Sequence, residues 1–154
     1  MNFTPRFLSQ VSLSGVCARY YEICSEHPPR LDEPLSRVRA TEIVTAATGR
    51  LSLSKLPGPG TVLQLDGLLP SVMLRFILQG RCSVETDFSV NFDERVERGT
   101  LAVLAHAALL HSGAEALRPP YPRPEFHSID ELLVIFQKLG NLANAIANVE
   151  NVPN

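Results

Sequence analysis

One histidine in the chain has a position that could support chemistry. His106 is the single strongly polar side chain in the apolar run of residues 101–110. If this run forms a central helix, the imidazole must be buried or face a cavity, where it could act as an acid or a base near neutral pH. A core histidine that is hydrogen-bonded to a carbonyl group is the simpler interpretation. The chemical hypothesis is a ligand pocket or small enzyme between sheet and helices, with His106 as its polar anchor and Phe88 and Phe92 in its wall.

A pair of carboxylates is the second candidate. Glu85 and Asp87 are two residues apart, so on a strand they lie on the same side, about 7 Å apart by the rise of a strand. Paired carboxylates at such separations occur in hydrolases. On the open side of an antiparallel sheet, however, charged side chains usually face water. We therefore expect a solvated face here, and the sequence predicts no catalytic residue.

The cysteines and histidines predict no metal site and no cofactor. Cys17, Cys24 and Cys82 form an odd set without a C-x-x-C pair, which argues against a disulfide framework and against structural zinc. His106 and His111 are five positions apart and lack the spacing of a helical metal pair. We expect Cys82 to be buried and unreactive. A reducing compartment, the cytoplasm, is the predicted location.

Bulk composition describes an ordinary globular chain. The 154 residues are 45% hydrophobic and 19% charged, which is typical of one folded domain spanning 1–154. A net charge of -2 makes nucleic acid an unexpected partner. The first residues do not form a secretory signal. The apolar run 101–110 has about half the length that a bilayer span requires, so no membrane partner is expected.

The middle of the chain predicts an antiparallel sheet of about four strands between residues 51 and 92. From Cys82 to Phe92 apolar side chains occupy most of the even positions and polar ones all of the odd positions, which indicates a half-buried strand. Gly80 and Arg81 could turn it back onto the run 71–79, which its period alone assigns to neither strand nor helix. Segments 51–54 and 61–65 are the remaining strand candidates. With helices covering one face, the predicted class is α+β.

Helices are predicted before and after this sheet. Apolar spacing indicates a short helix within 11–24, a second between Asp32 and Gly49, and a third over 101–117. A proline-rich connector, 118–127, follows and is expected to be extended. The last helix begins at Ser128. Ser128 and Glu131 are the two ends of a capping box.

The last helix is amphipathic and suggests the first of our two functional hypotheses. Its apolar residues recur every three or four positions, and they are Leu132, Ile135, Phe136, Leu139, Leu142, Ile146 and Val149. We call these seven residues the C-terminal seam. The seam requires a cover, either the helix at 101–117 or another chain. The second option predicts a non-enzymatic interaction or accessory module that docks a protein partner or a second copy of itself, as a homo-oligomer.

Overall fold

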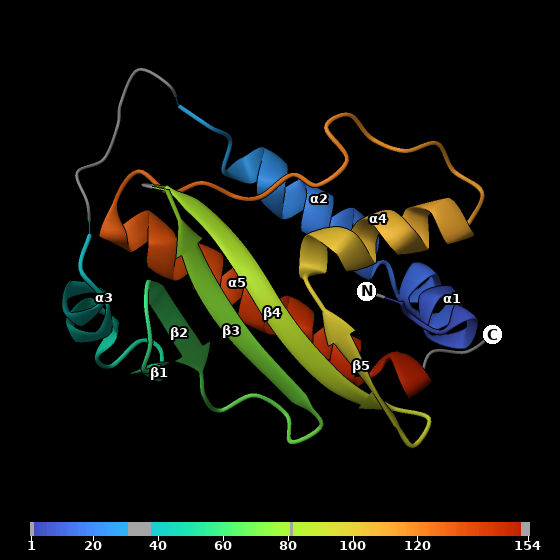
Figure 1. Ribbon diagram of the computed structural model, residues 1–154, viewed down its shortest axis with the longest axis horizontal. Coiled ribbons are helices and arrows are strands. Elements are labelled where there is room, and N and C mark those ends of the chain that lie inside the picture. Colours follow the sequence, from blue (N-terminus) through green and yellow to red (C-terminus); the bar gives the residue numbers. More distant parts are fainter. Residues whose placement is uncertain (1, 31–37, 81, 152–154) are drawn as a thin grey trace.

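The chain folds as an α+β domain with an antiparallel five-stranded sheet. A computed structural model describes residues 2–30, 38–80 and 82–151. Its helices are α1 (Pro5–Ser14), α2 (Val16–Glu26), α3 (Ala40–Ala47), α4 (Leu101–His111) and α5 (Ile129–Ala147), followed by the 3-10 turn η1 (Val149–Asn151). Its strands are β1 (Leu53–Lys55), β2 (Thr61–Leu65), β3 (Val72–Gln79), β4 (Ser83–Phe92) and β5 (Arg95–Gly99). The long helix α5 crosses behind β3 and β4 (Figure 1).

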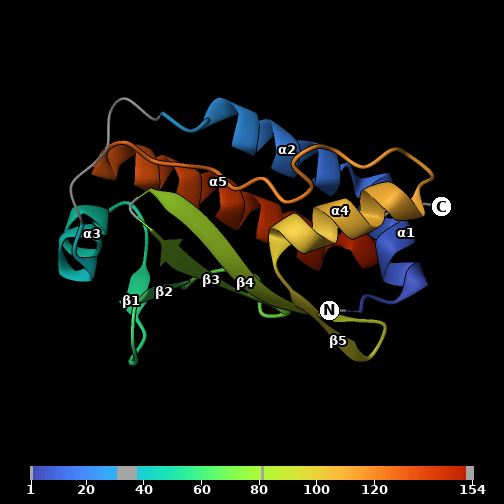
Figure 2. The same ribbon diagram turned by 45° about the horizontal axis from the view of Figure 1, so that its top comes forward.

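The strands follow one another in space in the order β1-β2-β3-β4-β5. Figure 2 shows α2, α4 and α5 gathered on one side of the sheet, which leaves the other side open. The run 71–79 forms strand β3, which pairs with β4. Its even-numbered side chains face the helices, and Leu74, for example, is buried opposite Phe88. The predicted strand is confirmed in β4, where Val84, Phe88 and Val90 are all buried, although Glu85 at an odd position is buried too. Arg81, half of the predicted turn, lies outside the described residues.

The fifth strand was not predicted. The predicted sheet ends at residue 92, but β5 follows and pairs with β4 through a two-residue turn at Asp93 and Glu94. Both turn residues have positive φ, 52° and 61°. β5 lies at the edge of the sheet and lacks an apolar alternation, with Val96 66% exposed. The buried carboxylate of Glu97 accepts hydrogen bonds from the backbone N–H and hydroxyl of Thr4.

Helix boundaries differ from the sequence prediction where glycine intervenes. Gly15, at φ 80°, ends α1 and precedes α2, so the segment predicted as one helix forms two. The helix predicted over 101–117 ends at His111, because the Ser112 hydroxyl bonds to the Leu109 carbonyl and Gly113 adopts φ 88°. Asp32, the predicted cap, lies outside the described residues. In the part of the chain described, no helix combines the length and apolar character needed to cross a membrane.

The chain covers its own C-terminal seam. All seven seam residues are at most 3% exposed, which places them in the core. Their main neighbours are β3, β4 and α2, together with α3, and not the helix at 101–117 that had been considered as their cover. Phe136 illustrates this packing, since its ring stacks on that of Phe76.

The connector 118–127 runs along the edge of β4. Its Glu125 pairs with Ser83 in an antiparallel bridge, and the flanking bonds run from Val84 N–H to the Pro124 carbonyl and from Phe126 N–H to the Cys82 carbonyl. β5 opposes the other end of the same strand. Residues 124–126 of the connector therefore occupy the beginning of this edge of β4, and β5 occupies its end.

Candidate functional site

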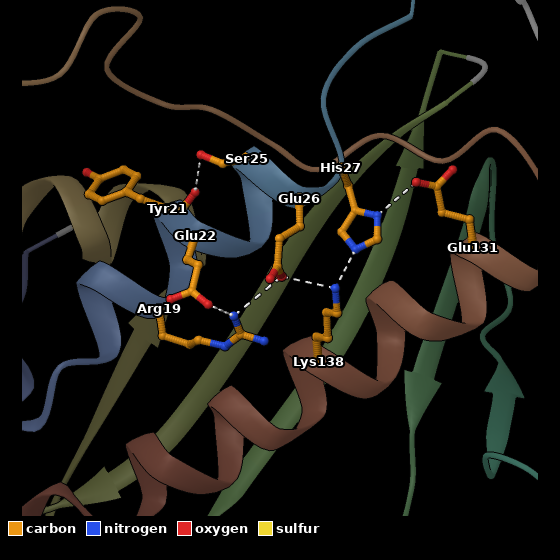
Figure 3. A network of polar contacts seen from close by, with 8 residues as sticks. All are labelled: Arg19, Tyr21, Glu22, Ser25, Glu26, His27, Glu131 and Lys138. Carbon is orange, nitrogen blue, oxygen red and sulfur yellow. Dashed lines mark hydrogen bonds and ion pairs between the residues drawn. The ribbon is translucent and has the colours of Figure 1, made fainter.

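A chain of hydrogen bonds joins the end of α2 to α5 through His27. The His27 side chain is 8% exposed, and its Nδ1 lies 2.8 Å from Oε2 of Glu131. On the other side of the ring, Nε2 lies 2.9 Å from Nζ of Lys138. Figure 3 shows Lys138 reaching from α5 to the end of α2, where it meets both His27 and Glu26. The site is thus built from groups that are more than 100 positions apart in the sequence.

The neighbours of His27 determine which ring nitrogen holds its proton. An ammonium group only donates, so Nε2 of His27 must accept from Lys138 when that amine is protonated. A carboxylate only accepts, so Nδ1 must carry a hydrogen and donate it to Glu131. The result is a carboxylate–imidazole–amine series with one hydrogen between each pair of groups. Enzymes use the same order of groups to activate a side chain: an acid orients a base, and the base activates a nucleophile.

Further charges surround the amine of Lys138. Nζ also bonds to Oε1 of Glu26, at 3.0 Å, and this carboxylate lies 3.4 Å from Nη1 of Arg19. Arg19 Nη1 pairs in turn with Glu22, at 2.6 Å. The hydrogen bond from Lys138 is the main cause that lowers the pKa of Glu26 below its usual value, and the charges of Lys138 and Arg19 add to it. Lys138 keeps 26% of its side chain exposed, so solutes can reach it.

Glu131 also holds the start of α5. Its backbone N–H donates to the Ser128 hydroxyl, at 3.0 Å, as the predicted capping box requires. Its Oε1, however, accepts from the N–H and Nδ1 of His127 instead of the Ser128 N–H. Burial acts to raise the pKa of Glu131, but the hydrogen bonds from His27 and His127 outweigh it, and the net pKa is lowered. The carboxylate is therefore ionised at neutral pH.

Two cavities lie on opposite sides of α2. The first, of about 260 Å³, lies between α2 and α5, and Arg19, Lys138, Asn141 and Ala145 are among its lining residues. The second, of about 330 Å³, lies between α2, α1 and α4, and its lining includes Cys17, Ala18, Tyr21, Ala108, Leu109 and Leu117. In Figure 3 the Tyr21 ring points away from the His27 network. We call these the polar cavity and the apolar cavity.

Polar atoms in the wall of the apolar cavity are mostly satisfied, with one exception. The hydroxyl of Ser12 donates to the Ala108 carbonyl at 3.1 Å, and that of Ser112 donates to the Leu109 carbonyl at 2.7 Å. The Tyr21 hydroxyl is buried and has no hydrogen-bond partner among the residues that the structure describes. Burial, followed by the nearby Cys17 and Cys24, raises the pKa of Tyr21 to about 12, and burial raises that of Cys17 to about 11. Both groups are neutral at physiological pH.

The structure places the residues of the predicted His106 pocket in two different sets of ring contacts. His106 is half-buried on α4, and its ring meets Tyr121 edge-on at 4.9 Å. Its Nδ1 is buried and finds no hydrogen-bond partner within the described part of the chain. Phe88 and Phe92 are buried against two other rings at the N-terminus, those of Phe3 and Phe7. The predicted aromatic wall is therefore core packing, and the apolar cavity lies elsewhere, beside the same helix.

The two carboxylates of the predicted pair have different surroundings, because the connector contacts one of them. Glu85, predicted to face water, is 6% exposed because Arg123 from the connector pairs with it. Asp87 does face outward and pairs with Arg98, at 3.0 Å. Each carboxylate thus has its own arginine partner. Cys82, predicted to be buried, is half-buried just before β4.

Sequence reasoning missed the residues that form the candidate sites. Neither His27, which precedes two prolines, nor Lys138, within the last predicted helix, was among the predicted site residues. Among the described residues, no group of three or more histidine, cysteine, aspartate or glutamate side chains is arranged to hold a metal ion. Comparison of the chain with protein-family models, with curated proteins and with solved structures gives no match.

Proposed function

We propose that this protein binds a small, neutral and largely apolar molecule in the apolar cavity. The single observation that carries the proposal is the Tyr21 hydroxyl, which is buried without a hydrogen-bond partner among the described residues and belongs to a residue of the cavity wall. Leaving a buried hydroxyl unpaired costs about 1–3 kcal/mol, so a ligand that accepts its hydrogen recovers that free energy. The apolar wall supplies the remaining affinity through burial of ligand surface.

The lining defines the chemistry of the ligand. None of the residues named in the wall is charged, so an ionic ligand would lose its hydration without compensation. Because Ser12 and Ser112 donate to backbone carbonyls, Tyr21 provides the available hydroxyl hydrogen. The ligand therefore carries a carbonyl, ether or hydroxyl oxygen as acceptor. A volume of about 330 Å³ accommodates roughly ten groups the size of water.

Ligand binding agrees with the packing of α5 better than partner docking does. Docking through the C-terminal seam would require seven core side chains to leave the interior, at a cost of several kcal/mol. The apolar cavity exists in the folded chain and needs no such step. The free state of all three cysteines supports the further proposal that the protein works in a reducing compartment such as the cytoplasm.

The test is a screen of neutral fragments by ligand-observed NMR, followed by titration on two variants. Ala18→Leu places a larger side chain at the apolar cavity, whereas Ala145→Leu makes the same change at the polar cavity. Both alanines are exposed helical positions, so the two variants are matched. We expect hits whose binding is lost in Ala18→Leu and retained in Ala145→Leu. Removal of the acceptor oxygen from a hit should weaken its binding about tenfold or more.

Two results would overturn the proposal. The first is a screen in which no neutral fragment binds the parent protein. The second is a set of hits that bind Ala18→Leu as well as they bind the parent.

A further inference from the structure

We propose that Lys138 is a nucleophilic amine that forms an imine with a small aldehyde or ketone bearing a carboxylate group, bound in the polar cavity. The proposal concerns the opposite side of α2 from the apolar cavity and does not depend on ligand binding there. It rests on the series Glu131–His27–Lys138 and on the cavity that Lys138 lines.

Proton transfer out of the lysine is the first requirement of such a reaction. A protonated amine has no lone pair, so it must lose a hydrogen before it can attack a carbonyl carbon. His27 Nε2 lies 2.9 Å from Nζ, within reach for direct transfer. The hydrogen bond between these two nitrogens requires one of them to be the acceptor. The pair is therefore arranged to share one proton.

Stabilisation of the charged imidazole is the second requirement. Once His27 has taken the proton, its Nδ1–H still donates to Oε2 of Glu131 at 2.8 Å, and the carboxylate balances the new charge. Oε1 of Glu131 is held by His127, which fixes the orientation of the carboxylate. Glu26 faces the amine from α2 and favours its protonated form, so transfer to His27 competes with that ion pair.

The cavity determines the class of substrate. At about 260 Å³ the polar cavity holds roughly nine groups the size of water, which suits a small molecule. Arg19 lines the same cavity, and both of its ion pairs use Nη1. Nε and Nη2 of the guanidinium group provide further donors with a geometry that matches a carboxylate. A short oxo acid can thus place its carboxylate at Arg19 and its carbonyl carbon at Lys138.

The reaction balances without an oxidant or a reductant. The ammonium of Lys138 gives one proton to Nε2 of His27, and the lone pair of Nζ forms a bond to the carbonyl carbon. The π electrons of the carbonyl move to its oxygen, which takes up the proton that His27 returns. A second proton from Nζ moves to this oxygen, the carbon–oxygen bond breaks, and water leaves. The product is a protonated imine that keeps the third hydrogen and the positive charge.

The chain contains an internal control for the test. Its sequence has two lysines, Lys55 and Lys138, and Lys55 is exposed on β1. We would incubate the intact protein with glyoxylate and cyanoborohydride at pH 7, which reduces an imine to a stable secondary amine. Peptide mass spectrometry then gives the rate of modification at each lysine. Lys138 should react at least about ten times faster than Lys55, because general base catalysis commonly contributes more than that.

Four variants separate activation of the Lys138 amine from mere access to it. His27→Gln should lower the rate at Lys138 to that of Lys55 or below, with folding checked by circular dichroism. Arg19→Ala should slow modification by glyoxylate more than modification by neutral propanal, and this variant keeps the proposal testable if His27→Gln unfolds. Ala145→Leu should slow both reagents, whereas Ala18→Leu should slow neither. Modification of Lys138 no faster than that of Lys55 in the parent protein would overturn the proposal. The network would then serve only as a set of ion pairs that connects α2 to α5.

Discussion

The rings of Phe76 and Phe136 lie stacked, with centroids 4.0 Å apart and planes inclined by 8°. Both side chains are fully buried, and the contact joins the middle of β3 to the first half of α5. Because the seam residues share this interior, α5 is a structural member of the core. Charge placed on the seam should therefore act on folding before it acts on association.

Leu139→Glu should unfold the protein instead of merely changing its oligomeric state. The substitution places a carboxylate at a position with no exposed surface, which should lower the free energy of unfolding by at least about 3 kcal/mol. Val134→Glu on the same helix is the control, because Val134 is 41% exposed and should change stability by less than about 1 kcal/mol. Urea denaturation and mass in solution measure both effects. A stable Leu139→Glu protein with reduced mass would instead support docking through the seam.

Loss of the hydroxyl should lower the stability of the protein at Tyr20 but not at Tyr21. Tyr20 donates to the Pro122 carbonyl at 2.7 Å, so Tyr20→Phe should lower the free energy of unfolding by about 1–3 kcal/mol. The Tyr21 hydroxyl has no partner in residues 2–30, 38–80 and 82–151, so Tyr21→Phe should leave stability unchanged or raise it by up to about 1 kcal/mol. Chemical denaturation of the two variants, without ligand, makes the comparison. Equal destabilisation would mean that Tyr21 has a hydrogen-bond partner in the unliganded protein.

Glu94→Gly should stabilise the hairpin of β4 and β5. Glu94 adopts φ 61°, which costs a residue with a side chain about 1–2 kcal/mol and costs glycine almost nothing. After the greater freedom of glycine in the unfolded chain is subtracted, the expected gain is about 0.5–1 kcal/mol. Glu94→Ala removes the same charge and keeps the strain, so it should show no such gain. A similar change in both variants would assign the effect to charge.

Loss of the Glu131 carboxylate should lower the free energy of unfolding more at neutral pH than at acidic pH. A carboxyl whose pKa is lowered on folding stabilises the fold when it is ionised, so its contribution is complete above its ordinary value of 4.5. The contribution disappears as the pH falls through the lower pKa of the folded state. Glu131→Gln should thus lower the free energy of unfolding by about 1–3 kcal/mol at pH 7 and by much less near pH 3.

The neighbouring residue provides the control for this pH dependence. Asp130 is 88% exposed on its side chain and pairs with Arg50 on the surface. Asp130→Asn should change stability by less than about 1 kcal/mol at either pH. Denaturation curves at several pH values test the sign, and a Glu131→Gln deficit that grows on acidification would contradict it.

Elements with a regular burial pattern along their own sequence were predictable, whereas the strand β5 at the edge of the sheet was not. The alternation in β4 and the spacing in α5 report burial on one face, and both elements formed where they were expected. β5 carries no such signal, because its outward side chains meet solvent and its buried Glu97 is satisfied by Thr4 at the far N-terminus. Helix α4 ended early because a local serine and glycine outweighed the continued apolar spacing.

The candidate sites depend on contacts across long sequence separations, which explains why they were missed. Nothing near His27 in the sequence indicates an acid on one side of its ring and an amine on the other. Glu131 was identified as a helix cap, and its second role became visible only through the position of α2. His106 was selected because it is isolated among apolar residues, but that isolation reflects its place between the core and Tyr121.

The connector along β4 has a consequence for how the molecule behaves in a crowded solution. A sheet edge with unpaired backbone groups can recruit the strands of neighbouring molecules and start aggregation. Here residues 124–126 occupy part of that edge, and proline at 122 and 124 cannot donate a backbone hydrogen bond to a further strand. The chain thereby carries its own safeguard against unwanted assembly along this side of the sheet.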